Sequence, residues 1–322
     1  MKRHRCSCGQ ELHFAALCCP ACGQTLVYRP SSRHLASSDG THTCELRENL
    51  GCNWTVSEAD YAQGYRQCRS CRLTSEIPWQ GDPRNVERWA KLEAAKRRML
   101  DGLNALNVPL PDTLRFVFLE DQRSNPTVEH EFVYSGHLNG VITINASEAD
   151  DVYRVQTREE MKEEYRTLLG HFRHEIGHAY WDFLIRDSRH LRAFRQLFGD
   201  ERVDYQAALE HHYQYGAPTD WAEAHISSYA SSHPFEDWAE TWAHYLHMTD
   251  ALETAIAHRA IAAPDVLIDF TERLREWRDL SQLLNDLSQA VGRKEAYPFT
   301  LPPRVEKKLA FIDRLLASAA KG

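Results

Sequence analysis

The string HEIGH at residues 174–178 combines residue types and a spacing that suit zinc-dependent hydrolysis. His174 and His178 are four residues apart, so on an α-helix both imidazoles share one face and can bind a single ion. Glu175 is rotated by about 100° from His174, so its carboxylate can flank the ion without binding it. In this H-E-x-x-H pattern, zinc lowers the pKa of water to about 7, and the glutamate accepts the proton as the water attacks a carbonyl.

The residues around this motif predict a half-buried helix. Apolar side chains recur at spacings of three and four residues, the pattern of one buried helix face; they are Leu168, Leu169, Phe172, Ile176, Ala179 and Phe183. The alternative to a zinc-binding helix is an exposed surface helix with scattered histidines. The apolar stripe argues against it, because an exposed helix would not carry one. His171 lies one turn before His174 on the same side. We expect it to hydrogen-bond a ligand or line the cleft, and a core histidine is the alternative.

A hydrolytic zinc site needs a third protein ligand and an open coordination position. The extended pattern H-E-x-x-H-x-x-G-x-x-H does not supply it here. Trp181 stands where the glycine would be, and Leu184 stands where the third histidine would be. The third ligand must therefore come from another segment.

The string HPFEDWAETWAHYLHM at 233–248 is the best source of that ligand. Pro234 opens a predicted helix on which Glu236, Glu240 and His244 share one face. Two acids beside large aromatic residues on a buried face need a partner, and a cation is the natural one. Solvated acids are the alternative, and the spacing alone does not say which glutamate would bind.

HEIGH followed by FEDWAE resembles the gluzincin metallopeptidases, in particular the lethal-factor type, where the first Glu of an E-x-x-A-E string binds zinc. The resemblance implies that Glu236 is the third ligand and that Glu240 supports the ligands without touching the ion. It also implies that Tyr229, seven residues before Glu236, hydrogen-bonds the oxyanion of the tetrahedral intermediate. A core tyrosine is the alternative for Tyr229, and His225, His233 and His244 receive no role.

Longer strings resemble a bacterial family of zinc-binding metallopeptidases that carry an N-terminal zinc-ribbon region. The resemblance covers about residues 6 to 250 and implies the peptidase architecture more firmly than any substrate. It rests on RTLLGHFRHEIGHAYWD, FGDERVDYQAAL and HPFEDWAETWAHYLH, together with CNW (52–54), CRSCR (68–72) and GVITINASEADD (140–151).

All nine cysteines lie before residue 72, a clustering that indicates metal binding in a reducing compartment. We expect two structural zinc sites with four thiolates each, which would contribute folding energy. Cys18 is an alternative to Cys19 in the first site, and His42 is a rival ligand in the second. The first set is Cys6, Cys8, Cys19 and Cys22, and the second is Cys44, Cys52, Cys68 and Cys71.

The length of 322 residues suggests two domains, with a turn-rich boundary in PWQGDPRN. We predict an α+β chain: a tandem zinc-ribbon region at 1–78 and a mainly helical zincin-like metallopeptidase domain with a small β-sheet at 79–322. Strands are expected at 114–121 and within 131–145, around the turn SGHLNG. Helices are expected at 84–106, 159–186, 190–198, 202–214, 219–230, 234–257, 264–290 and 303–319.

The net charge of −8 argues against a protein devoted to nucleic acid or a membrane surface, although residues 1–85 sum to +2. No apolar run reaches the roughly 18 residues that span a bilayer, and no apolar segment follows the basic N-terminus. We therefore expect a soluble, cytoplasmic protein without a membrane partner.

These features together predict a zinc metallopeptidase that uses one catalytic and two structural Zn²⁺ ions to hydrolyse peptide bonds of a peptide or protein substrate. The alternative is an adaptor that binds nucleic acid or protein through its zinc ribbons and carries a catalytically idle zincin-like domain. An amide hydrolase for small molecules is a third hypothesis, because cleft width does not follow from sequence.

Overall fold

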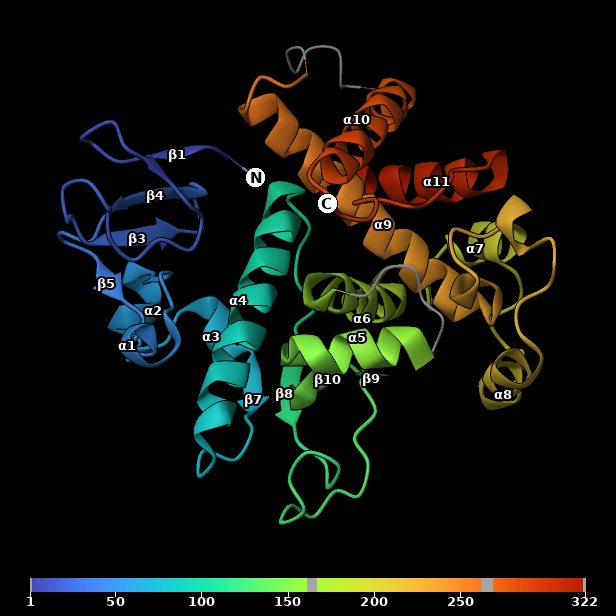
Figure 1. Cartoon of the computed structure of the whole chain (residues 1–322), viewed down its shortest axis with the longest axis horizontal. Helices are drawn as coiled ribbons and strands as arrows, with labels where there is room; N and C mark the ends of the chain where they lie inside the picture. Colours follow the sequence, from blue (N-terminus) through green and yellow to red (C-terminus); the bar gives the residue numbers. More distant parts are fainter. Residues whose placement is uncertain (1, 161–166, 262–268, 321–322) are drawn as a thin grey trace. The chain divides into compact units, whose positions relative to one another are not determined.

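The computed structural model describes residues 2–160, 167–261 and 269–320. The chain divides into two compact units. Of the described residues, the first unit comprises 2–107, 112–160 and 167–172, and the second comprises 108–111, 173–261 and 269–320. The first unit holds the β-sheets and the second is built of helices (Figure 1), which confirms the predicted α+β class.

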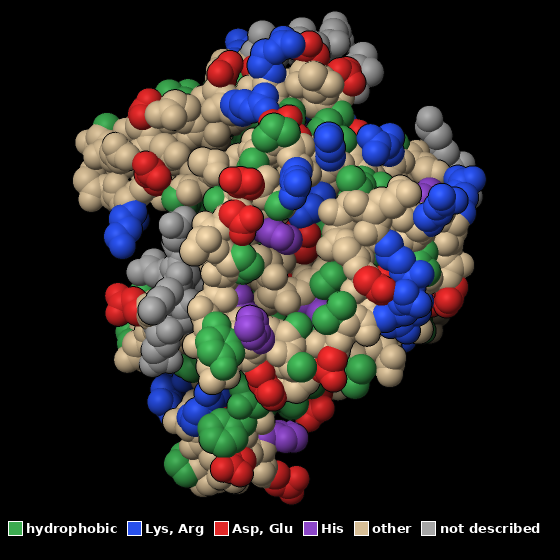
Figure 2. All heavy atoms as spheres, turned by 90° about the vertical axis from the view of Figure 1, so that its right-hand side faces the viewer, with side chains coloured by type: hydrophobic (Ala, Val, Ile, Leu, Met, Phe, Trp, Pro, Cys, Tyr) green, Lys and Arg blue, Asp and Glu red, His purple; other side chains and the backbone are tan. Residues whose placement is uncertain are grey.

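The surface that includes α8 (Tyr205–Tyr215) carries both acidic and basic side chains, with histidines among hydrophobic groups (Figure 2). No described helix is long and apolar enough to span a bilayer.

The N-terminal 72 residues form short elements that surround the two cysteine clusters. Strand β1 (His4–Arg5) pairs with β2 (Glu11–Leu12), β3 (Leu26–Arg29) with β4 (His34–Ser37), and β5 (His42–Thr43) with β6 (Thr55–Val56). The short helices are α1 (Arg47–Leu50), α2 (Glu58–Ala62) and α3 (Arg69–Arg72). Tyr28 and Trp54 pack their rings 5.7 Å apart in the small core between these hairpins.

A four-stranded sheet follows, in the order β7–β8–β10–β9. Strands β7 (Thr74–Glu76), β8 (Arg115–Leu119) and β10 (Val141–Asn145) are parallel neighbours, and β9 (Gly136–Leu138) is antiparallel to β10. Asn139 and Gly140 join β9 to β10 with positive φ angles of 51° and 87°, as expected for a tight Asn-Gly turn. The turn is therefore shorter than the predicted SGHLNG, and residues 131–135 are not strand.

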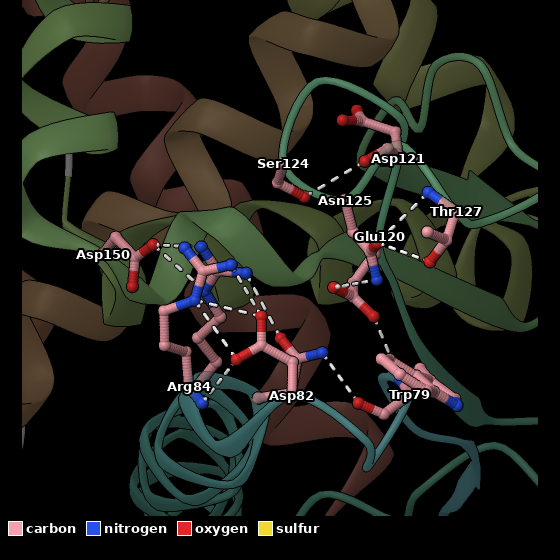
Figure 3. A network of polar contacts seen from close by, with 11 residues as sticks. Trp79, Asp82, Arg84, Glu120, Asp121, Ser124, Asn125, Thr127 and Asp150 are labelled. Atoms are coloured by element: carbon pink, nitrogen blue, oxygen red, sulfur yellow. Dashed lines mark hydrogen bonds and ion pairs between the residues drawn. The ribbon is translucent and has the colours of Figure 1, made fainter.

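The predicted boundary string is anchored to the sheet by a polar network (Figure 3). Asp82 caps α4 (Pro83–Ala105) by accepting a 2.9 Å hydrogen bond from the Arg84 N–H. The Trp79 N–H donates to Glu120 Oε2 at 3.1 Å, and Asn85 donates to the Trp79 carbonyl at 2.8 Å. These bonds tie residues 79–85 to the loop that follows β8, so the segment is structured rather than an extended linker.

Helix α9 (Pro234–Ala257) is the centre of the second unit. Helices α7 (Leu191–Phe198), α10 (Phe270–Ala290) and α11 (Pro303–Ala319) pack against it (Figure 1). Trp238 and Trp242 on α9 are fully buried, and Tyr180 of α6 (Leu168–Leu184) stacks on Trp242 with ring centroids 4.7 Å apart. Helix α8 (Tyr205–Tyr215) differs, because none of its residues is buried.

Two helix predictions need correction. Residues 219–230 are not a helix; they contain only the short 3₁₀ turns Trp221–Glu223 and Tyr229–Ser231. The single helix predicted at 159–186 is replaced by two helices. The first, α5 (Asp151–Glu160), begins eight residues before the predicted start, and the second, α6, begins at Leu168. Residues 161–166, and 264–268 of the predicted helix 264–290, lie outside the described residues.

Candidate metal centres

The H-E-x-x-H helix α6 and helix α9 approach each other closely at Gly177. A β-carbon added at Gly177 would lie 3.1 Å from the Ala239 Cα and 3.2 Å from the Trp242 ring. Trp238 Nε1 donates to the Gly177 carbonyl at 2.8 Å, a buried hydrogen bond between the two helices. The missing side chain thus lets the backbones approach, which brings the face of His174 and His178 toward the first turn of α9.

His174, His178 and Glu236 converge on one point. The two imidazole Nε2 atoms are 3.2 Å apart, His174 Nε2 is 3.0 Å from Glu236 Oε2, and His178 Nε2 is 3.5 Å from Glu236 Oε1. His174 and Glu236 are buried and His178 is partly buried. The structure therefore brings together the three predicted ligands of the catalytic zinc.

This donor set fits a zinc ion. Bonds of about 2.0–2.1 Å in a tetrahedron place ligand atoms about 3.3 Å apart, close to the 3.2 Å between the two imidazole nitrogens and the 3.0 Å between His174 Nε2 and Glu236 Oε2. Glu236 Oε2 is buried and accepts no hydrogen bond from any described residue, so its charge is free to face a cation. Two imidazoles and one carboxylate are also the ligand types of catalytic zinc sites that keep a position open.

Glu240 contacts the Nδ1 side of the His174 ring, opposite the Nε2 atom that faces His178 and Glu236. His174 Nδ1 lies 2.7 Å from Glu240 Oε1, and Ser227 donates to Glu240 Oε2 at 2.7 Å. Because a carboxylate only accepts, the proton of His174 is assigned to Nδ1, which leaves the lone pair on Nε2 for the ion. The supporting role that the resemblance implied for Glu240 stays a prediction.

The electrostatics of the site favour a bound cation. Burial alone would lower the pKa of His174, but its contacts with Glu236 and Glu240 hold that pKa well above its ordinary value. Burial alone would raise the pKa of Glu236, but the charges of His178 and His174 bring it to about 2. The cluster thus holds concentrated negative charge, which either a proton on His174 or a metal ion offsets.

Glu175 and Tyr229 both lie near the three converging ligands. Glu175 is 4% exposed, and its negative charge contributes to raising the pKa of Tyr229, after burial and the charge of Glu236. The Tyr229 ring centroid is 6.1 Å from that of His174. The roles predicted for these two residues stay predictions.

The first cysteine cluster joins two turns. Cys6 Sγ lies 3.6 Å from Cys22 Sγ, and Cys8 Sγ lies 3.6 Å from Cys19 Sγ, close to the roughly 3.8 Å that 2.3 Å zinc–sulfur bonds require. Cys19 is the clustered residue, and Cys18 is exposed outside the group. Gly9 and Gly23 follow the two turns with φ angles of 91° and 71°, which favour glycine.

The second cluster comprises Cys44, Cys52, Cys68 and Cys71, all buried. Cys52 Sγ is 3.7 Å from the sulfurs of both Cys68 and Cys71, again the spacing of a tetrahedral zinc site. The rival ligand His42 lies elsewhere: its ring stacks on Tyr61 and its Nε2 is 3.1 Å from Glu58.

A buried guanidinium faces the second cluster. Burial would lower the pKa of Arg97 on α4, but the negative charges of Cys52 and Glu93 raise it. Four thiolates around Zn²⁺ carry a net charge of −2, so a nearby buried cation partly offsets that charge.

Comparisons with known proteins agree with this geometry. Residues 85–315 match the family described as "Putative zinc-binding metallo-peptidase", and residues 3–81 match a zinc-ribbon domain. The chain belongs to this zinc-binding metallopeptidase family. Uncharacterized proteins of Mycobacterium tuberculosis and Mycobacterium bovis are each 40% identical to it over 336 residues, which cover 98% of this chain and 95% of theirs. No solved structure matches.

The match bears out the resemblance seen in the sequence, including the N-terminal zinc ribbon, and supports zinc binding. For this member of the metallopeptidase family, the structure also shows two contacts that sequence reasoning missed. Tyr205 donates to Glu236 Oε1 at 2.7 Å, and Ser227 holds Glu240. Neither position follows a spacing rule relative to H-E-x-x-H. Tyr205 lies in the string FGDERVDYQAAL that carries the resemblance, but the resemblance gave it no role.

The remaining histidines near the motif have partners in the structure. His171 Nδ1 lies 2.9 Å from Glu148, His233 caps α9, and His244 Nδ1 lies 2.7 Å from the Tyr297 hydroxyl. His225 Nδ1 lies 3.4 Å from Asp237. The expectation that His171 supports a ligand or lines the cleft stays a prediction.

Proposed function

We propose that this chain is a zinc-dependent peptidase of gluzincin type that hydrolyses peptide bonds in a peptide or protein substrate. The observation that carries the proposal is the convergence of His174, His178 and Glu236 within 3.0–3.5 Å beside a buried Glu175. A zinc ion bound there would polarise the scissile carbonyl and acidify a water molecule.

Glu175 acts as the general base and then as the acid. Its carboxylate accepts a proton from the attacking water and returns it to the nitrogen of the leaving amine. Its near-complete burial keeps competing solvent away and strengthens its electrostatic coupling to the site. Tyr229 donates its O–H to the oxyanion of the tetrahedral intermediate, where the negative charge develops.

The two cysteine clusters hold structural zinc, which gives three ions per chain with the catalytic one. Their sulfur spacings and the zinc-ribbon match support this stoichiometry. Thiolate sites of this kind persist in reducing compartments, so we infer that the enzyme works in the cytoplasm.

The decisive test replaces Glu175 with Gln in the full-length chain. We expect three zinc ions per chain by elemental analysis and a loss of at least about 1,000-fold in the cleavage of a peptide library, because a neutral amide cannot accept the proton. Glu210→Gln on α8, where the side chain is exposed, is the matched control and should leave the rate unchanged. Wild-type-like turnover by Glu175→Gln would refute the mechanism, and two zinc ions in the wild-type chain would refute the catalytic site.

A further inference from the structure

The two oxygens of Glu236 have different surroundings. Oε1 accepts the hydroxyl of Tyr205 at 2.7 Å. Oε2 is buried, lies 3.0 Å from His174 Nε2 and accepts no hydrogen bond from the described residues. An oxygen that already accepts a hydrogen bond is the weaker ligand of the two, so the carboxylate presents Oε2 to a cation in preference to Oε1.

Tyr205 is held in place by the start of α9. His233 caps that helix: its Nδ1 accepts the Phe235 N–H at 3.0 Å, so its Nε2 carries the proton and donates to the Val203 carbonyl at 3.1 Å. The His233 ring also meets the Tyr205 ring edge-on, with centroids 5.1 Å apart.

The beginning of α8 is fixed as well. Asp204 caps α8 by accepting the Ala207 N–H at 3.0 Å. The residues on both sides of Tyr205 are therefore anchored, although the Tyr205 side chain itself is 40% exposed. The hydroxyl reaches Glu236 from an anchored backbone rather than from a loose surface position.

We propose that Tyr205 is a positioning residue that makes Glu236 bind the catalytic zinc through one oxygen and so keeps a coordination position open for water. This inference rests on the proposed function. Carboxylates bind metals through one or both oxygens, and three single-atom ligands leave a tetrahedral zinc one open position. If both oxygens of Glu236 bound the ion, a bound water would become its fifth ligand and would be held and acidified less strongly.

Cobalt substitution tests the binding mode without relying on hydrolysis. The full-length chain is loaded with two zinc ions in the cysteine clusters and one Co²⁺ in the helical site, a composition verified by elemental analysis. Four-coordinate Co²⁺ absorbs visible light several-fold more strongly than five-coordinate Co²⁺. The variant is Tyr205→Phe, and Tyr215→Phe at the exposed end of the same helix is the control.

We expect Tyr205→Phe to retain Co²⁺ and its wild-type melting temperature but to lose most of the visible absorption. With zinc, kcat should fall about 10- to 100-fold while KM changes little, because a five-coordinate ion binds and acidifies its water less strongly but does not alter the contacts with substrate. Tyr215→Phe should match the wild type in both measurements. A Tyr205→Phe spectrum identical to that of the wild type would overturn the inference while leaving the peptidase proposal intact. A wild-type chain that takes up no Co²⁺ at the helical site would instead overturn the proposed function.

Discussion

The position of one proton on His174 decides how well this histidine binds a cation. With Nδ1–H directed at Glu240, the Nε2 lone pair faces the point shared with His178 and Glu236. Glu240→Gln removes the negative charge that fixes this tautomer. We expect zinc affinity at the helical site to fall about 10- to 100-fold, measured by competition with a chromogenic chelator.

Ser227→Ala is the graded control for that change. It removes the 2.7 Å hydrogen bond to Glu240 Oε2 but keeps the carboxylate, so affinity should fall less than with Glu240→Gln. Equal affinity of Glu240→Gln and the wild type would show that Glu240 does not orient the histidine.

The site residues that sequence reasoning found lie in recognisable strings, whereas Tyr205, which it missed, acts through a contact between distant segments. His174 and His178 belong to a string whose helical spacing carries the geometry, whereas Glu236 was singled out from Glu240 by the resemblance to gluzincins. Tyr205 reaches Glu236 across 31 residues of sequence, through a helix that buries none of its own residues. This contact depends on His233, which caps α9 and also contacts Val203 and Tyr205 at the start of α8. The periodicity of the sequence does not predict such a contact.

Among the helices, α6 and α9 must stay close for the ligands to converge. A β-carbon at Gly177 would lie 3.1 Å from the Ala239 backbone, which cannot move without shifting α9. Overpacking of this kind costs about 1–3 kcal/mol, which exceeds the roughly 0.5–1 kcal/mol that alanine gains over glycine in a helix. We expect Gly177→Ala to lower the free energy of unfolding by about 1–2 kcal/mol in urea titrations and to weaken zinc binding.

Gly136→Ala provides the comparison, because an added β-carbon there meets no atom within 4 Å. It should change stability by less than about 0.5 kcal/mol. A Gly177→Ala protein as stable as Gly136→Ala, with wild-type zinc affinity, would contradict the close approach of the two helices.

The element predictions failed where side chains compete with the helix for backbone groups. In the segment 219–230, Ser227 Oγ accepts the Ala230 N–H at 3.1 Å, and Ser231 donates to the Ser228 carbonyl at 2.6 Å. These local bonds favour turns over a continuous helix. Helices α9 and α11 were predicted correctly because a proline opens each and an uninterrupted apolar pattern follows.

At the scale of the molecule, buried charges link distant stretches of sequence to the metal centres. In the first unit, Arg97 of α4 faces the second cysteine cluster, and Cys71 lies 3.8 Å from Glu93, which pairs with the fully buried Lys96 at 2.8 Å. Helix α4 thus contributes charged groups to a cluster whose ligands all precede it. This explains why the ribbons and α4 form one compact unit although their patterns suggested a boundary between them.

The C-terminal helix makes an equivalent connection in the second unit. Lys308 on α11 donates to Asp237 at 2.5 Å and to the Ala224 carbonyl at 2.6 Å, and both charged side chains are buried. Asp237 follows Glu236, the predicted third zinc ligand, and Ala224 precedes the segment that carries Ser227 and Tyr229. One ammonium group therefore fixes the start of α9 relative to that segment.

Loss of this ammonium should destabilise the second unit and its metal site together. Lys308→Met leaves Asp237 buried without its ion-pair partner, which costs about 3–5 kcal/mol. We expect that loss in urea unfolding, with weaker zinc binding at the helical site, whereas Lys307→Met at an exposed neighbouring position should cost less than about 0.5 kcal/mol. The double variant Lys308→Met/Asp237→Leu should recover part of the stability because no unpaired charge remains. If Lys308→Met were as mild as Lys307→Met, α11 would not support the site, and the contribution of the C-terminal region would have to lie in other contacts.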